Sequence, residues 1–382
     1  MDFESLFDIP IDDLHTPCYL TDARLLQKNT VLLKQIQQRT GCKILLAQKA
    51  FSLFSSYPLI RDNLAGTTAS GLFEAKLGRE HFGKEVHVFS PAYTQEDFTQ
   101  LLELCDHIVF NSFGQWKKYR QQVQDATRNI SCGIRINPGY AEVETDLYNP
   151  CISGSRMGVP LEQMEDDFAG LDGIHFHTMC EQNSDVLERT LDHMLPQFDK
   201  WLKRCKWVNF GGGHHITRPD YDVERLVRCI ERVRDTYGVQ VYLEPGEAVA
   251  LNAGYLVATV LDVVQNGMDI AILDASAACH MPDVLEMPYR PHILYSGTAG
   301  EKAYTYRLAG NTCLAGDVIG DYSFDHQLQA GEKLVFCDMA IYSMVKNNTF
   351  NGVPLPDIAL YQNGHIDLVK RFGYADFEGR LS

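Results

Sequence analysis

Short apolar segments alternate with amphipathic segments between about residue 20 and residue 250, and this alternation constrains the fold more than any other feature. The apolar segments have the length and composition of buried strands, and the amphipathic segments have helical spacing. Eight strands separated by helices favour a closed parallel (β/α)8 barrel, with an open doubly wound sheet as the alternative. The predicted strands are Ile44–Ala47, Ala65–Ala69, Glu85–Phe89, His107–Phe110, Cys132–Ile136, Gly173–His177, Trp207–Phe210 and Val239–Leu243. The clearest predicted helices are Ala23–Gln38, Gln95–Leu104 and Val186–Lys203.

The pattern changes after Gly254, where no long helical segment separates the predicted strands. These strands are Tyr255–Val264, Asp269–Asp274, Lys333–Cys337 and His365–Lys370. Gly, Pro and Asn interrupt them, which is typical of a mostly antiparallel β domain. The segment Thr16–Leu20 is expected to add a strand to it. We therefore expect a barrel domain over residues 21–253 and a β domain over residues 1–20 and 254–382.

The charge balance excludes some classes of partner. The 382 residues include 34 basic and 50 acidic side chains, a net charge of -16. Nucleic acids and anionic membranes attract clusters of Lys and Arg, so neither is expected as a partner. No apolar segment reaches the roughly 20 residues that cross a bilayer. Eleven scattered cysteines without a Cys-x-x-Cys pair or zinc spacing predict a reducing, cytoplasmic location and no metal site.

Lys49 is the first residue that indicates chemistry. It follows an apolar strand, at the end where a barrel opens its catalytic face. A lysine there can form a Schiff base with an aldehyde cofactor, because a partly desolvated setting lowers its pKa. The alternative is a surface lysine at the end of a strand.

Three further strand ends carry polar or flexible residues. Gly211, Gly212 and Gly213 let backbone N–H groups approach a phosphate, or they form a tight turn. His177 can stack on an aromatic cofactor ring, or it has a structural role. Glu244 can hold a pyridine nitrogen protonated through a charge-assisted hydrogen bond, or it is a loop carboxylate.

Together with Ser155–Gly158, these residues resemble the fold-type III pyridoxal-phosphate decarboxylases, the alanine-racemase-like family that includes the ornithine and diaminopimelate decarboxylases. The resemblance covers almost the whole chain and continues through Cys313, Asp317, Tyr342 and Thr349–Gly352.

This resemblance implies a role for each of these residues and a homodimer with active sites at its interface. The cofactor pyridoxal 5'-phosphate is expected on Lys49, with His177 stacked on its ring and Glu244 at the ring nitrogen. Its phosphate is expected at Gly211, Gly212 and Gly213, with Tyr342 nearby. Cys313 is expected to return a proton to the substrate carbon.

Within this family, His175–Asn183 and Glu244–Glu247 are similar to the branch that acts on polyamine precursors. That likeness implies decarboxylation of carboxynorspermidine or carboxyspermidine. Relatives usually carry an arginine at position 247, so phosphate binding here is expected to depend more on the glycine loop. The cationic tail of such a substrate calls for carboxylates, and the candidates are Glu247, Asp283 and, more weakly, Asp317.

Three other functions stay open at this point. A diaminopimelate or other basic amino-acid decarboxylase would need cationic residues for a second carboxylate, and Glu247 and Asp283 argue against these. A non-catalytic protein that binds pyridoxal phosphate would have no use for a β domain carrying Cys313. A sugar-processing barrel would leave Lys49 and the glycine loop without a role.

Overall fold

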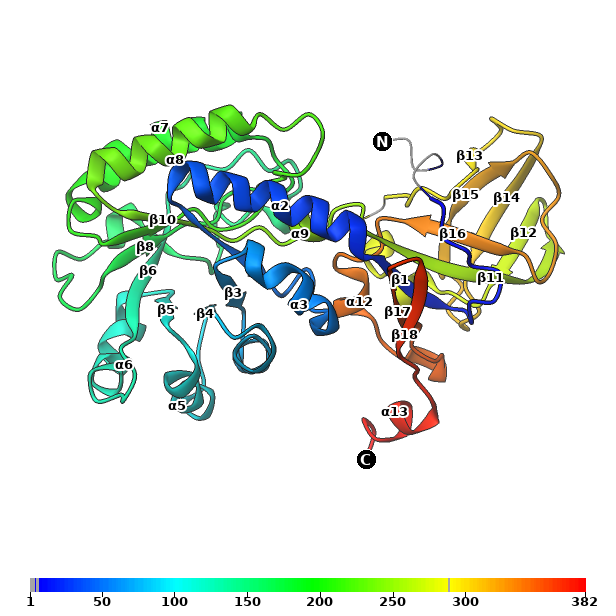
Figure 1. Ribbon diagram of the computed structural model, residues 1–382, viewed down its shortest axis with the longest axis horizontal. Helices are drawn as coiled ribbons and strands as arrows, with labels where there is room; N and C mark the ends of the chain where they lie inside the picture. Colours follow the sequence, from blue (N-terminus) through cyan, green and yellow to red (C-terminus); the bar gives the residue numbers. More distant parts are fainter. Residues whose placement is uncertain (1–3, 5–6, 288) are drawn as a thin grey trace. The chain divides into compact units, whose positions relative to one another are not determined.

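The computed structural model describes residue 4, residues 7–287 and residues 289–382. The chain forms two compact units, one of Gln27–Val249 and one of Met1–Leu26 with Ala250–Ser382 (Figure 1). Each unit has a hydrophobic core of its own.

Eight parallel strands close into a barrel in the Gln27–Val249 unit (Figure 1). They are β2 (Lys43–Ala47), β3 (Gly66–Ala69), β4 (Glu85–Phe89), β5 (His107–Phe110), β6 (Ser131–Asn137), β8 (Gly173–His175), β9 (Trp207–Asn209) and β10 (Gln240–Leu243). Neighbours in this order pair with one another, and the pairing of β10 with β2 closes the ring. A short strand, β7 (Val159–Pro160), pairs with the end of β6. The predicted barrel is therefore confirmed, and the open sheet is excluded.

Helices lie between most of the barrel strands. They are α3 (Tyr57–Ile60), α4 (Leu72–Leu77), α5 (Gln95–Leu104), α6 (Phe113–Gln124), α7 (Ser184–Leu202) and α8 (Val223–Tyr237). In addition, α2 (Ala23–Thr40) precedes β2, and α9 (Glu247–Ala250) follows β10. The side chains of Thr94, Ser112 and Asp222 each accept a backbone N–H three residues further on, which fixes where α5, α6 and α8 begin. Among the described residues, no helix combines the length and apolar character that crossing a membrane requires.

The second unit contains a mostly antiparallel sheet, as predicted. Its strands are β1 (Cys18–Asp22), β11 (Gly254–Gln265), β12 (Asp269–Leu273), β13 (Gly297–Thr298), β14 (Tyr304–Ala309), β15 (Val318–Phe324), β16 (Lys333–Cys337), β17 (Asp357–Gln362) and β18 (His365–Lys370). Its short helices are α10 (Ala277–His280), α11 (Asp283–Glu286), α12 (Ser343–Lys346) and α13 (Tyr374–Glu378). The N-terminal segment adds a strand as expected, because β1 pairs with both β11 and β17.

The sequence analysis did not predict the two-residue strand β13 or the longer strands β14, β15 and β17. In β14 buried and less buried positions alternate, and Arg307 pairs across to Asp321 of β15. β14 and β15 therefore lack the continuous apolar run on which the prediction depended, whereas β17 contains such a run at residues 358–361 and was overlooked. Two barrel strands also end earlier than predicted, β8 at His175 and β9 at Asn209, because the chain turns there into the loops that carry the candidate site.

Candidate active site

One cavity opens where the barrel strands end, and Lys49 lies in it, two residues beyond β2. Its lining residues are Ala47, Lys49, Thr68, Ala69, Ser70, Phe89, Arg135, His175, His177, Gly212 and Glu244. The Lys49 side chain is exposed where it borders this cavity. Desolvation by the surrounding protein lowers its pKa, as does the charge of Arg135, while Glu244 and Glu247 oppose the shift. A lowered pKa increases the share of uncharged amine, which is the form that attacks an aldehyde.

Glu244 is a buried carboxylate held by one donor on each oxygen. His175 Nε2 lies 3.2 Å from Oε2, and Asn209 Nδ2 donates to Oε1 at 2.8 Å. Burial alone would raise the pKa of Glu244, but the neighbouring His175 and His87 and the hydrogen bond from Asn209 lower it below its usual value. Glu244 is therefore ionised at neutral pH, as its predicted partnership with a protonated ring nitrogen requires.

His177 has its tautomer set by the backbone. The Gly212 N–H donates to Nδ1 at 2.8 Å, so Nδ1 carries no proton and Nε2 carries it. Burial lowers the pKa of His177 well below its usual value, as do the charges of Lys49 and Arg135. The imidazole that borders the cavity is therefore neutral.

The glycine loop, Gly211–Gly213, has no room for larger residues because neighbouring backbone approaches it closely. Gly211 and Gly213 have φ values of +69° and +82°. A Cβ at Gly213 would lie 1.9 Å from the Met179 carbonyl oxygen, and a Cβ at Gly212 would lie 2.6 Å from that of Glu244. The N–H groups of Gly211 and Gly212 already donate to Asn209 Oδ1 and His177 Nδ1. Within the described chain, only the Gly213 N–H of this loop has no acceptor, so it is the donor left for a phosphate.

Arg135 is a cavity residue that the sequence analysis missed. It is 5% exposed, its guanidinium lies 4.6 Å from the centre of the Phe89 ring, and it donates to the His177 carbonyl at 3.3 Å and to Met157 Sδ at 3.7 Å. No described carboxylate forms a salt bridge with it, and burial lowers its pKa to about 10. A buried cation with such weak partners is suited to an anionic ligand atom.

Arg135, His175 and Asn209 also share one level of the barrel. His175 is the register partner of Arg135 on β6 and of Asn209 on β9. Each of these polar residues interrupts an otherwise apolar strand close to its C-terminal end. That interruption is the signal that could have identified them from sequence.

Glu247 lies at the start of α9 and is half-buried. Its charge raises the pKa of Lys49 and, together with burial, the pKa of the Cys180 thiol. Glu247 therefore shares the electrostatic environment of the candidate lysine.

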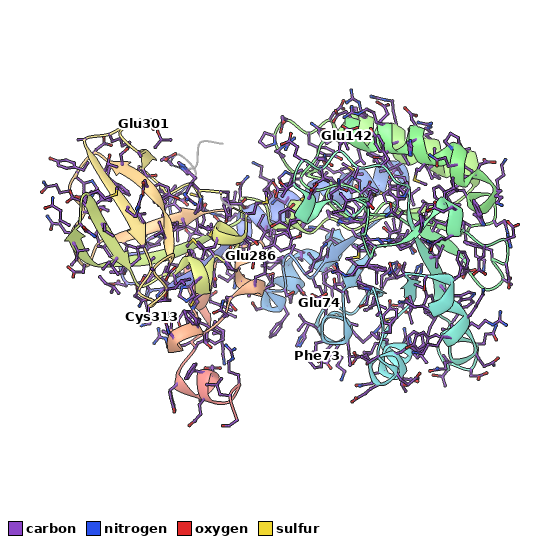
Figure 2. The ribbon with its side chains drawn as sticks, turned by 180° about the vertical axis from the view of Figure 1, so that it is seen from behind. Phe73, Glu74, Glu142, Glu286, Glu301 and Cys313 are labelled. Carbon is purple, nitrogen blue, oxygen red and sulfur yellow. The ribbon has the colours of Figure 1, made fainter. Side chains whose placement is uncertain are left out.

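The remaining predicted residues belong to the Met1–Leu26 and Ala250–Ser382 unit. Cys313 is exposed at the surface of this unit, away from the tip that carries Glu301 (Figure 2), and its backbone N–H donates to Asn351 Oδ1 at 2.8 Å. Asp317 is only 3% exposed, and its Oδ2 accepts from Ser276 Oγ at 2.8 Å and Thr312 Oγ1 at 2.7 Å, while its Oδ1 accepts the Ala278 N–H at 3.1 Å. The Asp317 carboxylate thus holds Thr312, the residue before Cys313, in place. This favours a structural role for Asp317 over contact with a substrate.

Asp283 and Tyr342 lie near α11 and α12 of the same unit. Asp283 forms an ion pair with Lys346, which also contacts Glu286 at 2.6 Å. These three groups carry a net negative charge, so a further cation remains attractive there. Tyr342 has a φ of +57°, an uncommon value for a bulky residue and one that is more frequent at functional sites.

A cluster of three possible metal ligands lies near the opposite end of the barrel. It consists of Glu85, His87 and His107, whose ligand atoms lie within 4.8 Å of one another. The two imidazoles are stacked, with centroids 3.9 Å apart and planes 8° from parallel. Imidazole lone pairs lie in the ring plane, so an ion in the plane of one ring would lie outside the plane of the other. Lys43 also pairs with Glu85. This geometry favours a structural network over a metal site.

The cavity residues together fit pyridoxal phosphate. Lys49 offers an amine to an aldehyde, Glu244 offers a carboxylate to a ring nitrogen, and His177 offers a neutral ring face. Arg135 and the Gly213 N–H are available to anionic oxygens. This set of donors and acceptors matches the groups of that cofactor.

Comparisons with known proteins agree with this fit. A family model described as "Pyridoxal-dependent decarboxylase, C-terminal sheet domain" matches residues 18–340. The chain is 41% identical over 382 residues to the carboxynorspermidine/carboxyspermidine decarboxylase of Campylobacter jejuni, covering 97% of this chain and 99% of that protein. It is also 41% identical over 375 residues to the carboxyaminopropylagmatine decarboxylase of Synechocystis, covering 97% of this chain and 96% of that protein.

Among solved structures, the crystal structure of carboxynorspermidine decarboxylase complexed with norspermidine from Campylobacter jejuni superimposes with a TM-score of 0.89 at 40% identity. The match covers 96% of this chain and 100% of that chain. The predicted family resemblance is confirmed: the chain belongs to the pyridoxal-phosphate-dependent decarboxylases and is a carboxy-lyase that uses pyridoxal phosphate.

Proposed function

We propose that this enzyme removes the α-carboxylate of carboxynorspermidine and carboxyspermidine, giving norspermidine and spermidine. The observation that carries this substrate class is the 41% identity, over 97% of the chain, to the enzyme of that name in Campylobacter jejuni. The solved neighbour that contains norspermidine supports the same class.

The proposed residue roles follow from charge. Pyridoxal phosphate, when bound, supplies a sink for the electron pair that stays on the substrate carbon as the carboxylate leaves. Lys49 holds the cofactor through its amine, whose lowered pKa favours the uncharged form. Glu244 is ionised and accepts a hydrogen bond from the ring nitrogen, which keeps that nitrogen protonated. His177 presents its neutral ring face, and Cys313 delivers a proton to the substrate carbon.

We propose that the cationic tail is bound by Glu247 and Asp283. Glu247 is supported by its influence on the pKa of Lys49, which indicates that its charge lies near the reacting amine. Asp283 is expected to contribute less, because Lys346 already neutralises part of its charge. Asp317 stays the weakest candidate, because Ser276 and Thr312 donate to its Oδ2 and the Ala278 N–H donates to its Oδ1.

Carboxyaminopropylagmatine is a second candidate substrate, because a close relative is named for it. The Synechocystis relative, equally identical at 41%, is named carboxyaminopropylagmatine decarboxylase. A tail derived from agmatine ends in a guanidinium, which pairs with carboxylates at least as well as an ammonium does. Diaminopimelate is a weaker alternative, because identity to the Escherichia coli diaminopimelate decarboxylase is 22% and Glu247 would repel a second carboxylate.

We also propose a cytoplasmic homodimer whose active sites lie at the interface. All eleven cysteines are free, which is consistent with a reducing compartment. We assign pyridoxal-phosphate binding to a barrel domain of residues 21–253, and we assign Cys313 and Tyr342 to a β domain of residues 1–20 and 254–382.

Steady-state kinetics on four substrates tests the assignment. The purified holoenzyme is assayed with carboxynorspermidine, carboxyspermidine, carboxyaminopropylagmatine and diaminopimelate under identical conditions. The proposal predicts the highest kcat/KM for one of the first two, with less than about a 200-fold difference between them, because one methylene changes binding by about 1–3 kcal/mol at most. If kcat/KM is highest for carboxyaminopropylagmatine or diaminopimelate, the proposed substrate is wrong and that compound takes its place.

A further inference from the structure

The hydrogen bonds around Glu244 restrict its carboxylate to one orientation. Oε1 accepts from Asn209 Nδ2 at 2.8 Å, and Oε2 faces His175 Nε2 at 3.2 Å. The two donors come from neighbouring strands, where His175 and Asn209 are register partners. The barrel backbone therefore fixes both donors, and the carboxylate cannot rotate without losing one of them.

The orientation of the Asn209 amide is itself determined. Its Oδ1 accepts the Gly211 N–H at 2.9 Å, so the amide oxygen must face the glycine loop. The amide NH2 group must then face Glu244. Asn209 thus couples the glycine loop to the carboxylate and can serve it only as a donor.

His175 is fixed in a similar way. It is 2% exposed, and burial lowers its pKa, so the imidazole is neutral at pH 7. A neutral imidazole has one N–H, and the nitrogen that faces a carboxylate must carry it. Its other nitrogen, Nδ1, has no hydrogen-bond partner among the described residues, which agrees with an unprotonated Nδ1. Phe89 stacks on the ring at 5.6 Å and limits its rotation.

We infer that His175 and Asn209 are positioning residues that hold Glu244 ionised and directed at the ring nitrogen of the cofactor. The inference rests on the proposed role of Glu244. It adds that His175 and Asn209 control whether the ring nitrogen is protonated. Neither of them needs to touch the cofactor.

The chemistry of the two donors determines the effect of each substitution. Asn209→Asp keeps the acceptor for Gly211 but places a second carboxylate against Glu244. Two facing carboxylates share a proton, so Glu244 becomes a weaker acceptor for a protonated ring nitrogen. His175→Phe keeps an aromatic ring beside Phe89 and removes the N–H. His175→Gln restores an N–H donor without an imidazole.

Nitrogen NMR on holoenzyme loaded with ring-15N pyridoxal phosphate reports the protonation of the cofactor directly. Wild type, His175→Phe, His175→Gln, Asn209→Asp and the control His193→Phe are compared at about pH 8. His193 lies on α7 and contacts the Pro138 carbonyl instead of Glu244. Cofactor loading is verified for each variant by the mass of the borohydride-reduced protein, so that only loaded, folded protein is compared.

The inference predicts a protonated ring nitrogen in wild type, His175→Gln and His193→Phe. It predicts that the protonated fraction falls below one half in His175→Phe and Asn209→Asp. If the wild-type nitrogen is itself unprotonated, the role of Glu244 in the proposed function is wrong. A protonated wild type with unchanged His175→Phe and Asn209→Asp spectra would overturn the positioning role alone.

Discussion

Removing the charge of Glu247 or Asp283 tests whether this enzyme selects a cationic tail. Glu247→Gln and Asp283→Asn preserve the size of each side chain. We expect Glu247→Gln to lower kcat/KM for carboxynorspermidine more than Asp283→Asn does. The order follows from the surroundings of each carboxylate.

The magnitudes come from burial and from existing partners. Loss of one member of a desolvated charge pair costs about 2–5 kcal/mol, and an exposed pair is worth about 0–1 kcal/mol. Glu247 is half-buried, so the lower end of the first range, about 2 kcal/mol or roughly 30-fold, is expected. The Asp283 side chain is 23% exposed and already paired with Lys346, so at most about 1 kcal/mol, or roughly fivefold, is expected.

The assay is steady-state decarboxylation at low and moderate salt, with the cofactor absorbance recorded as a measure of loading. The effect should lie mostly in KM if the tail is held equally in the ground and transition states, and it should weaken with salt for Asp283. Glu301→Gln serves as a matched control, because its carboxylate accepts hydrogen bonds from Thr298. Wild-type kcat/KM in both amide variants at both salt concentrations would refute the reasoning, and the tail would then be recognised elsewhere.

Three further predictions concern the lysine, the cysteine and a buried histidine. Lys49→Ala should abolish covalent cofactor attachment and activity, and borohydride labelling of a different lysine would contradict the assignment. Cys313→Ala should load cofactor but slow protonation of the substrate carbon by about 10²–10⁴-fold, or misdirect it. Mixing Cys313→Ala with Lys49→Ala should restore part of the activity if the sites are shared between subunits. Verified subunit exchange without recovery would count against the shared site. Burial lowers the pKa of His280 to about 4, and its ring nitrogens pair with the Ser276 N–H and the Pro354 carbonyl. Between about pH 6.5 and pH 4 the unfolded chain therefore binds a proton that the folded chain does not, and the folded state loses about 2 kcal/mol of stability by about pH 5. His280→Gln should flatten the pH dependence of the denaturant midpoint. An unchanged dependence would show that His280 does not titrate in that window.

The barrel was predictable because most of its strands are continuous apolar runs. The observed β4 and β5 match the predicted Glu85–Phe89 and His107–Phe110 at both ends. In the other unit the strand Lys333–Cys337 was found on the same ground. The missed β14 and β15 carry polar residues among their apolar ones, such as Arg307 and Asp321, so their sequences show no apolar run.

The candidate site was predictable where a residue stands at a strand end. Lys49, His177, Gly212 and Glu244 were each predicted on that ground, and the structure places all four round one cavity. Arg135, His175 and Asn209 were missed, although the last two end β8 and β9, because an isolated polar residue in an apolar run does not reveal its partner. The engagement of Asp317 was also unpredictable, because Ser276 is 41 residues away in the sequence.

The charges of the barrel cavity give an independent argument for a cationic substrate. Arg135 contributes one positive charge and Glu244 one negative charge, and His175 and His177 are neutral. Glu247 lies outside the lining but is close enough for its charge to raise the pKa of Lys49. The proton held on the ring nitrogen balances Glu244, but a bound phosphate adds further negative charge. Because uncompensated charge is costly in a partly desolvated site, the loaded cavity should favour a ligand that brings positive charge with it. A polyamine tail supplies such charge, whereas the second carboxylate of diaminopimelate would increase the imbalance.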